Sequence, residues 1–401
     1  MVQQPDSLSV SSRPPPKQRV WSWRSQAFRG TVYQIVALAV LLAAAAYLLH
    51  NTFANMRMRG IQSGFSFILQ PAGFGIGESL LPFDSSNSYL YAYVVALSNT
   101  LRVALLGIVL ATVLGTVIGI GRLSRNALVS TLCGAYVEIT RNVPLLLQLF
   151  IWYFILTESL PPIEEAWQAN GFFFSKNGLQ FPLPVAELGA HLSTLGGTAL
   201  GLVAAWWYAR QARLRRESTG AMWPVWWPSV ALVVGLTVLG WMAGGMHTEW
   251  DIPERTELNV VGGGSVTPEY LTVLLGLTIY TAGYIAEVVR AGIQSVPYGQ
   301  HEAAASLGLS RAQELRLVLL PQALRVIIPP ITSQYLNLTK NSSLAVAVGY
   351  PDLVSISSTS LNQTGRAIEC IALVMACYLT MSLLTSAFMN FYNARARLKD
   401  R

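Results

Sequence analysis

The chain has 401 residues, of which 52% are hydrophobic and only 12% are charged. This composition, with a mean hydropathy of +0.43, excludes a set of soluble domains and predicts an integral membrane protein. The net charge of +7 does not indicate nucleic acid as a partner, because the basic residues lie in short blocks between apolar runs rather than on one face.

The amino-terminal part is predicted to be a tail, an anchor and a loop. Residues 1–30 are rich in Ser, Pro and Gln, and most of their charged residues are basic. We therefore expect a disordered cytoplasmic tail. Residues 31–50 are apolar and about twenty residues long, enough to cross the hydrocarbon core. A cleaved signal peptide is the alternative, but the long charged lead favours an anchor. Residues 51–93 follow as an outer loop whose aromatic side chains are suited to the membrane surface or to packing on the protein.

Residues 94–157 contain the next two predicted spans. The first covers about 94–120. The second begins with an amphipathic lead at 127–141 and continues through 143–156, and Pro144 marks the point where the chain turns into the bilayer. The loop between these spans is short and basic, which places it inside.

Residues 158–267 contain two acidic segments, 158–190 and 246–267, which we interpret as outer loops. Between them lie two apolar runs, 194–208 and 225–243, separated by four arginines. The arginines between the two runs favour an inserted pair of membrane crossings, with the connection between them on the inner side. The first run is short and could instead be re-entrant.

Residues 268–393 contain the last three predicted spans. These cover about 270–289, 322–338 and 368–391, and Pro329-Pro330 is expected to interrupt the middle one. A short basic tail, 394–401, ends the sequence.

The distribution of positive charge tests this topology. Of the 27 Lys and Arg residues, about three lie in predicted inner segments for each one in an outer segment. Cytoplasmic loops of membrane proteins carry such an excess. The pattern predicts eight crossings with both termini in the cytoplasm.

The inner segment at about 297–321 has an unusual pattern. Pro297 suits the first turn of a helix, Gly308 suits a helix end, and Ser310 with Gln313 has capping-box spacing. We predict two short helices joined at the glycine, with alanines on the outer face of the first. The alternative is that an alanine-rich run is merely a good helix former.

This segment resembles the EAA loop of ABC importer membrane subunits, the cytoplasmic helix pair that docks into a separate ATPase. The residues that carry the resemblance are Glu302, Ala303, Ala304, Gly308, Leu320 and Pro321, with Val318 where isoleucine is usual. The resemblance implies that they couple the chain to the ATPase. We expect Glu302 to cap or pair at the docking surface rather than do chemistry.

Three other segments occur in order with it: RNVPLLLQLF at 141–150, the run 284–297, and TKNSSL at 339–344. Together they closely resemble polar-amino-acid ABC importer permeases of the histidine-permease type, over roughly 95–157 and 268–393. The added anchor and the inserted pair of spans look like the longer subunit of general L-amino-acid permeases. The inserted pair itself has no recognisable motif.

The resemblance implies an all-α polytopic membrane protein with a type I ABC importer permease core and cytoplasmic coupling helices. It also implies an inner-membrane importer of L-amino acids. Its expected partners are a periplasmic amino-acid-binding protein, a second, paralogous permease subunit in a heterodimer, two copies of a cytoplasmic ABC ATPase, and lipid. The sequence has no GxxxxGKS/T phosphate-binding motif. ATP and Mg are therefore expected on the ATPase, with no cofactor on this chain, which we predict is not an enzyme.

Polar residues within spans are the default candidates for the substrate path, because exposing them to lipid is costly. They are Gln148, Tyr284, Glu287, Asn337, Lys340 and Asn341. The Pro329-Pro330 interruption would add free backbone groups. The alternative is that Glu287 with Arg290, and Glu138 with Arg141, are structural ion pairs.

Two other classes of protein fit the sequence less well. An ion-coupled secondary transporter also uses broken helices and polar groups at mid-membrane, but it would leave the EAA segment unexplained. A membrane enzyme would need a catalytic or metal constellation. His301-Glu302 lacks an HExxH arrangement and the three cysteines are unclustered, so we predict no metal site.

Overall fold

The computed structural model describes residues 23, 25–58, 60, 63–185, 188–219, 223–245, 249–256 and 259–396. It has two compact units, Met1–Gly64 and Phe65–Arg401. Most of the predicted tail at 1–30, and the end of the one at 394–401, lie outside the described residues.

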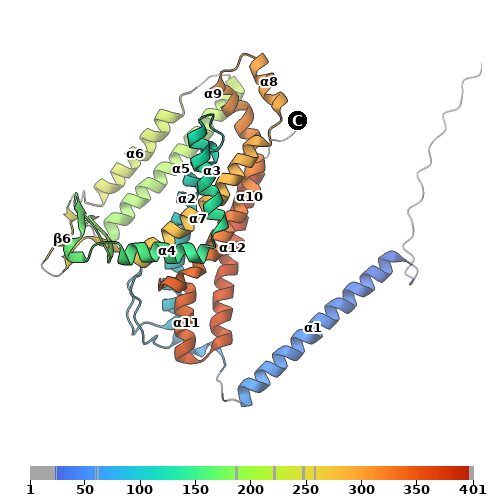
Figure 1. Cartoon of the computed structure of the whole chain (residues 1–401), viewed down its shortest axis with the longest axis vertical. Coiled ribbons are helices and arrows are strands. Elements are labelled where there is room, and N and C mark those ends of the chain that lie inside the picture. The colour runs from blue at the N-terminus through green and yellow to red at the C-terminus, as the bar shows by residue number, and fades with distance from the viewer. Residues whose placement is uncertain are drawn as a thin grey trace, which may run out of the picture. The chain divides into compact units, whose positions relative to one another are not determined.

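The first unit contains one long helix, α1 (Gln26–Met58), which extends beyond the predicted anchor at 31–50 on both sides (Figure 1). Most of its large apolar side chains are exposed, from Tyr33 to Met58. The helix is long and apolar enough to cross a membrane. A helix that is apolar on every side is suited to a lipid environment.

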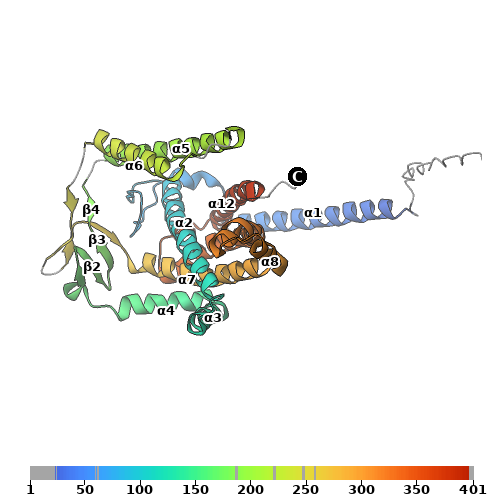
Figure 2. The ribbon, with the colours of Figure 1, turned by 90° about the horizontal axis from the view of Figure 1, so that it is seen from above.

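Helix α7 (Pro268–Gln294) is the centre of the second unit. Helices α2 (Tyr89–Gly121) and α10 (Leu320–Asn341) pack against it, and α12 (Ala367–Ala396) packs against α10. Figures 1 and 2 show this arrangement from two directions. In the most apolar stretch of α7, 67% of the residues are buried, the largest share in the described spans.

Two glycines allow α2 to lie directly against α7. A Cβ atom added at Gly115 would lie 2.7 Å from Ile285 Cβ, and one added at Gly119 would lie 2.6 Å from the carbonyl oxygen of Ala286. Small residues at such positions let helices approach closely in a membrane protein. The contact therefore depends on these residues having no side chain.

The predicted turn at Pro144 separates two helices. Helices α3 (Ala127–Asn142) and α4 (Leu145–Glu158) meet at an angle of 107°. Val143 and Pro144 have extended backbone between them. The sequence predicted the position of this turn, and the structure shows that it is sharp.

The predicted interruption of the seventh span is wrong, because α10 continues as a helix through Pro329 and Pro330. Proline removes a backbone donor and strains the preceding turn. Both prolines are exposed, however, while Ile327, Ile328 and Ile331 are buried. Packing of this buried face holds the helix through the two prolines.

Short helical segments surround α10. A π-helical turn, Leu315–Leu319, leads into it. A 3₁₀ segment (Ser342–Val348) and α11 (Leu353–Thr364) follow it.

A separate 3₁₀ turn, Phe65–Leu69, precedes α2 at the beginning of the second unit.

The two predicted outer loops in fact contain short β-strands. A four-stranded antiparallel sheet has the order β1 (Trp167–Ala169), β2 (Phe172–Ser175), β3 (Gly178–Phe181) and β8 (Gly264–Val266). Phe173 pairs with Gln180, and Leu179 pairs with Val266. Two smaller pairs are β4 (Leu183–Pro184) with β5 (Trp250–Asp251), and β6 (Glu254–Arg255) with β7 (Val260–Val261).

The first hairpin turn has a sequence signal that the loop interpretation overlooked. Asn170 and Gly171 both have positive φ, 49° and 80°. Asn-Gly is the preferred pair for the two-residue turn of a β-hairpin. A 3₁₀ turn, Ile163–Glu165, precedes this hairpin.

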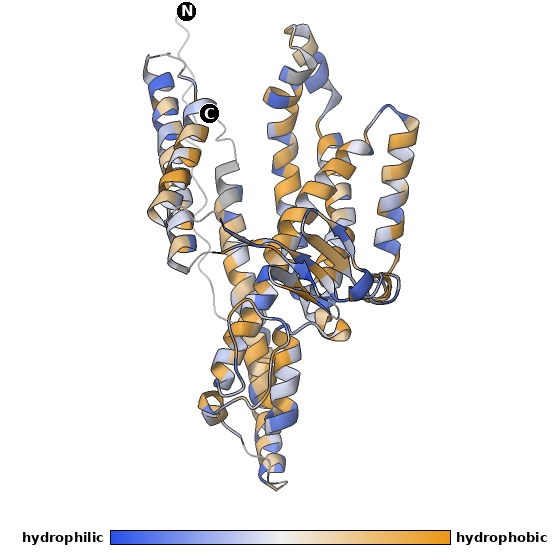
Figure 3. Cartoon of the chain, turned by 90° about the vertical axis from the view of Figure 1, so that its left-hand side faces the viewer, coloured by the Kyte–Doolittle hydropathy of each residue, from blue (hydrophilic) through white to orange (hydrophobic). Residues whose placement is uncertain are grey.

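Helices α5 (Leu188–Thr219) and α6 (Trp226–Ala243) form the inserted hairpin. Figure 2 shows it beside the central helices, with the sheet at one end. Figure 3 shows apolar residues along the long helices and in strands of the sheet, with hydrophilic residues gathered mainly at the connections and helix ends.

Six described helices are long and apolar enough to cross a membrane, or seven if α3 and α4 form one span. The eighth predicted crossing, 194–208, lies in α5, which does not meet that criterion among the described helices. Four arginines follow the apolar run within the same helix. A crossing there stays a prediction.

The contact between α2 and α7 can be tested with valine substitutions. Gly119→Val should lower the free energy of unfolding by about 1–3 kcal/mol, because the new side chain must displace the α7 backbone. Gly134→Val is the matched control, since nothing lies within 4 Å of a Cβ atom at that position. Thermal unfolding of the purified protein measures both. Equal stability of the two variants would contradict the close packing.

Candidate functional site

The predicted EAA segment forms a short helix with a well-defined end. Helix α8 (Tyr298–Ser306) is followed by Gly308 in the left-handed conformation, with φ at +68°. The amide of Gly308 donates to the carbonyl of Ala305 at 2.9 Å, and that of Leu309 donates to Ala304 at 3.2 Å. This is the Schellman pattern, in which glycine is the preferred residue.

The second predicted helix begins with the expected capping box. The Ser310 amide donates to Gln313 Oε1 at 2.9 Å, and the Gln313 amide donates to Ser310 Oγ at 3.4 Å. The helix that follows, α9 (Arg311–Glu314), does not end as a separate unit. It continues through the π-helical turn into α10, so the second half of the segment is the first part of a span.

Two polar contacts hold α8 against the following helices. His301 Nδ1 lies 2.5 Å from Glu314 Oε1, and Gln322 Nε2 donates to Gln300 Oε1 at 3.1 Å. Glu302, which was expected to cap or pair at the docking surface, makes neither of these two contacts. No periodic pattern in the sequence predicts the pairing of His301 with Glu314, because the chain between them includes the left-handed turn at Gly308.

The coupling residues predicted from the sequence lie on two elements. Glu302 and Ala303 are exposed on α8, and Gly308 is exposed at its end. Ala304, however, is buried at 2% exposure, so the alanines do not all lie on the outer face as predicted. The other two, Leu320 and Pro321, begin α10.

Apolar side chains project from the same region. Tyr298 is 75% exposed and Leu307 is 78% exposed. Exposed apolar side chains that gather on one segment provide a surface suited to contact with another protein. The surface formed by Tyr298, Glu302, Ala303, Leu307 and Gly308 is called the α8 surface below.

Glu287 lies at the centre of an ion-pair cluster near the carboxyl end of α7. It pairs with Arg290 one turn later and with Arg122 from the end of α2. Arg141 from α3 lies 3.9 Å from the same carboxylate. The structural pairing of Glu287 with Arg290 is confirmed, whereas Arg141 pairs with Glu287 rather than with Glu138.

Two other predicted path residues lie close to this cluster. The Arg141 guanidinium lies over the Tyr284 ring, 5.3 Å from its centroid. Gln148 Nε2 donates to the carbonyls of Thr140 and Val143, each at 2.9 Å. Gln148 therefore satisfies backbone acceptors at the bend between α3 and α4, where the helical hydrogen bonds stop.

The remaining three predicted path residues, Asn337, Lys340 and Asn341, lie together in the last turns of α10. Asn337 and Lys340 are exposed. Their neighbour Leu338 packs 3.5 Å from the Cβ position of Gly107, close to the middle of α2. Gly107 is fifteen residues before Arg122, or about 22 Å along the helix. These three residues therefore lie at a different depth from the Glu287 cluster.

An exposed lysine beside the middle of a membrane helix requires an explanation. Charged groups at that depth face a water-filled cavity or another protein chain, because contact with lipid is costly. Lys340 is therefore the strongest of the six predicted path residues.

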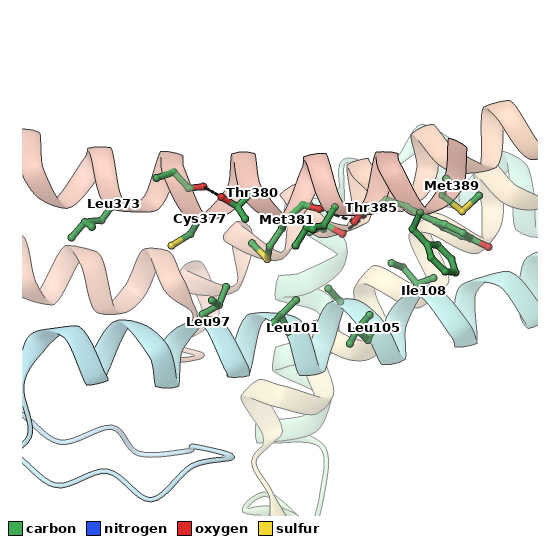
Figure 4. Close-up of a pocket in the computed structure, with 16 residues that line it drawn as sticks. Leu97, Leu101, Leu105, Ile108, Leu373, Cys377, Thr380, Met381, Thr385 and Met389 are labelled. Carbon is green, nitrogen blue, oxygen red and sulfur yellow. Dashed lines mark hydrogen bonds between the residues drawn. The ribbon is translucent and has the colours of Figure 1, made fainter. Parts of the chain in front are cut away.

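A cavity of about 670 Å³ lies between α2, α10 and α12. Figure 4 shows side chains such as Leu101, Leu105 and Met381 along it. The hydroxyls of Thr380 and Thr385 donate to carbonyls of their own helix, both at 2.8 Å. No lining residue carries a charge, so the cavity does not match a ligand with an ammonium and a carboxylate group.

A largely buried polar cluster that the sequence did not reveal lies near the amino end of α7. Arg102 Nη1 lies 2.8 Å from Glu78 Oε1, and the guanidinium lies 4.1 Å from the Tyr270 ring centroid. The other carboxylate oxygen of Glu78 accepts from the amide of Thr267 at 3.2 Å. The only signal of this cluster in the sequence was an arginine, Arg102, within an apolar span. Its partner, Glu78, lies in a segment predicted to be an outer loop.

Comparison with known proteins gives a match over most of the chain. Residues 105–398 match the family described as binding-protein-dependent transport system inner membrane component. The general L-amino acid transport system permease protein AapQ of Rhizobium johnstonii is 44% identical over 387 residues, covering 95% of this chain and 96% of the relative.

Two further relatives have similar coverage. The glutamate/glutamine/aspartate/asparagine transport system permease protein BztB of Rhodobacter capsulatus is 40% identical over 406 residues, covering 93% and 95% of the two chains. The glutamate/aspartate import permease protein GltJ of Escherichia coli K12 is 26% identical over 325 residues, covering 81% and 95%.

Proposed function

The chain belongs to the family of inner-membrane components of binding-protein-dependent transport systems, and we propose that it imports L-amino acids as one membrane subunit of an ATP-driven complex. The observation that carries the choice of cargo is the 44% identity to a general L-amino acid permease over 95% of this chain. That similarity extends through the inserted hairpin, which lies well inside the aligned length. The substrates named for these relatives are all amino acids.

The proposed coupling site is the α8 surface. Its exposed Tyr298 and Leu307 provide apolar contact, while Glu302 provides a charge at its edge. The ATPase that it contacts would be a separate polypeptide and would hold ATP and Mg, because this sequence has no phosphate-binding motif. Leu320 and Pro321 would transmit the contact into α10.

The proposed substrate path includes the polar end of α10. Lys340, Asn337 and Asn341 offer one cation and two amides, which suit the carboxylate and ammonium groups of an amino acid. Tyr284, Glu287 and Gln148 lie nearer the inner end, where they form ion pairs, ring contacts and backbone hydrogen bonds. We propose that these three support the inner end of the path.

The complete importer would contain further chains. We propose a paralogous second permease subunit, two copies of the ATPase and a periplasmic amino-acid-binding protein. The chain would lie in the bacterial inner membrane with both termini in the cytoplasm. The excess of positive charge in predicted inner segments supports this orientation.

The source of energy separates this proposal from an ion-coupled transporter. We expect uptake by the reconstituted complex, assayed with a panel of radiolabelled L-amino acids, to require ATP and binding protein. It should persist when an ionophore collapses the ion gradients. Uptake that continues without ATP but stops with the ionophore would support the ion-coupled transporter instead.

Replacement of Lys340 tests the path. Lys340→Met should reduce uptake at least tenfold, because the carboxylate of the substrate loses its cation at mid-membrane. Lys176→Met, in the β2–β3 turn, is the matched control and should transport normally. Initial uptake rates at equal protein levels measure both. Normal uptake by Lys340→Met would remove this residue from the path.

Replacement of Gly308 tests the α8 surface. Gly308→Leu should leave membrane insertion intact but uncouple ATP hydrolysis from uptake, because leucine is strained in the left-handed conformation and changes the exposed end of α8. Gly365→Leu is the control, since Gly365 also has a φ of +68° and nothing lies within 4 Å of its Cβ position, but it ends α11. ATPase and uptake rates are measured together. Coupled transport by Gly308→Leu would contradict the assignment.

A further inference from the structure

The inserted hairpin is held together by small residues. On α5, Gly197, Gly201 and Ala205 are buried at four-residue spacing. A Cβ atom added at Gly197 would lie only 2.3 Å from the carbonyl oxygen of Leu236. Such stripes let two helix backbones meet in a membrane without large interlocking side chains. The two helices therefore use their small faces against each other.

The opposite faces of the hairpin are apolar and exposed. Leu200, Leu202 and Val203 on α5 are 58–64% exposed, and Val234 and Leu239 on α6 are 55–58% exposed. No charged residue occurs in α6. These faces are suited to acyl chains, which are as apolar as the side chains themselves.

One end of the hairpin combines exposed tryptophans with arginines. The tryptophans are Trp206, Trp207, Trp223, Trp226 and Trp227, each 45–71% exposed. The Arg210 guanidinium lies 5.7 Å from the Trp206 ring centroid, and that of Arg215 lies 4.4 Å from the Trp223 ring centroid. Arg213 and Arg216 are exposed beside them. We refer to this group as the Arg–Trp cluster.

The charge of this region is strongly one-sided. Glu217 is the only acidic residue in the sequence between 188 and 248, against the four arginines. The cluster lies at the end of α5 remote from the sheet, whose strand β8 leads directly into the start of α7. Since α8 follows the other end of α7, the cluster and α8 belong to the same side of the membrane.

We propose that the Arg–Trp cluster binds the headgroups of anionic phospholipids in the leaflet on the side of α8. Tryptophan is enriched at the level of the headgroups, and clustered arginines beside a membrane helix attract anionic lipids. Arginine also binds phosphate oxygens in a two-pronged geometry. A phospholipid therefore matches both halves of the surface, with its phosphate on the arginines and its chains on the exposed apolar faces.

This proposal assigns a role to the inserted hairpin, which the substrate path and the α8 surface do not use. It rests on membrane insertion alone and not on the nature of the cargo. A direct lipid-binding measurement therefore separates its failure from failure of the proposed amino-acid transport.

Quenching of tryptophan fluorescence by brominated lipids tests it on the complete, detergent-solubilised complex. Titrations compare brominated phosphatidylglycerol with brominated phosphatidylcholine. A variant with phenylalanine in place of the five tryptophans of the cluster provides the background to subtract. The wild type should bind the anionic lipid more tightly, by about fivefold for each arginine that contacts a headgroup.

Two quadruple variants identify the cause of the preference. Replacing Arg210, Arg213, Arg215 and Arg216 by glutamine should abolish the preference for phosphatidylglycerol. Replacing the same four by lysine should retain most of it and controls for folding. Equal preference in the wild type and the glutamine variant would overturn the proposal. Absence of quenching by either lipid would also overturn it, because it would show that another subunit covers the cluster.

Discussion

The close contact between α2 and α7 determines the arrangement of charged residues around the carboxyl end of α7. Gly115 and Gly119 bring the two backbones together, and Arg122 follows Gly119 by three residues on α2. That spacing places the guanidinium one turn further along, where it meets Glu287 of α7. A side chain on either glycine would move Arg122 away from its partner. The ion-pair cluster is therefore a consequence of backbone packing as much as of charge.

Helices α7 and α10 both run from the region of the α8 surface into the interior of the protein. They pack tightly at Gly292, where an added Cβ atom would lie 2.2 Å from Ile327. Because α10 is continuous through its two prolines, its 22 residues extend about 33 Å as one element. The start of α10 adjoins the proposed coupling segment and its end carries Lys340. A displacement at α8 can thus reach mid-membrane without passing through a flexible joint.

Local signals in the sequence predicted local structure well, and contacts between distant residues were not predictable. The capping box at Ser310 and the turn at Pro144 depend on a few neighbouring residues, so their patterns are readable. Arg122 and Glu287 are 165 residues apart, and no periodicity links them. The prolines of α10 were misread because proline weakens an isolated helix, whereas buried isoleucines on the other face decide the outcome here.

The pairs formed by Arg102 and Arg122 show which helices form the fixed frame of this chain. Arg102 lies in α2 and Arg122 caps its end. They are twenty residues or about 30 Å apart, which is close to the thickness of the hydrocarbon core. Arg122 binds Glu287 on α7, and Arg102 binds Glu78, which also accepts the amide of Thr267 at the start of α7. Arg122 thus pairs with α7 directly at one end of the two helices, where the glycines also pack, and Glu78 links Arg102 to the start of α7 at the other end. Separating the two helices would leave several charges unpaired at once, which costs far more than tilting them together. The rearrangements of transport therefore belong to elements outside this pair, and α10, packed on α7 but free of such a double attachment in the described residues, is the element best placed to move.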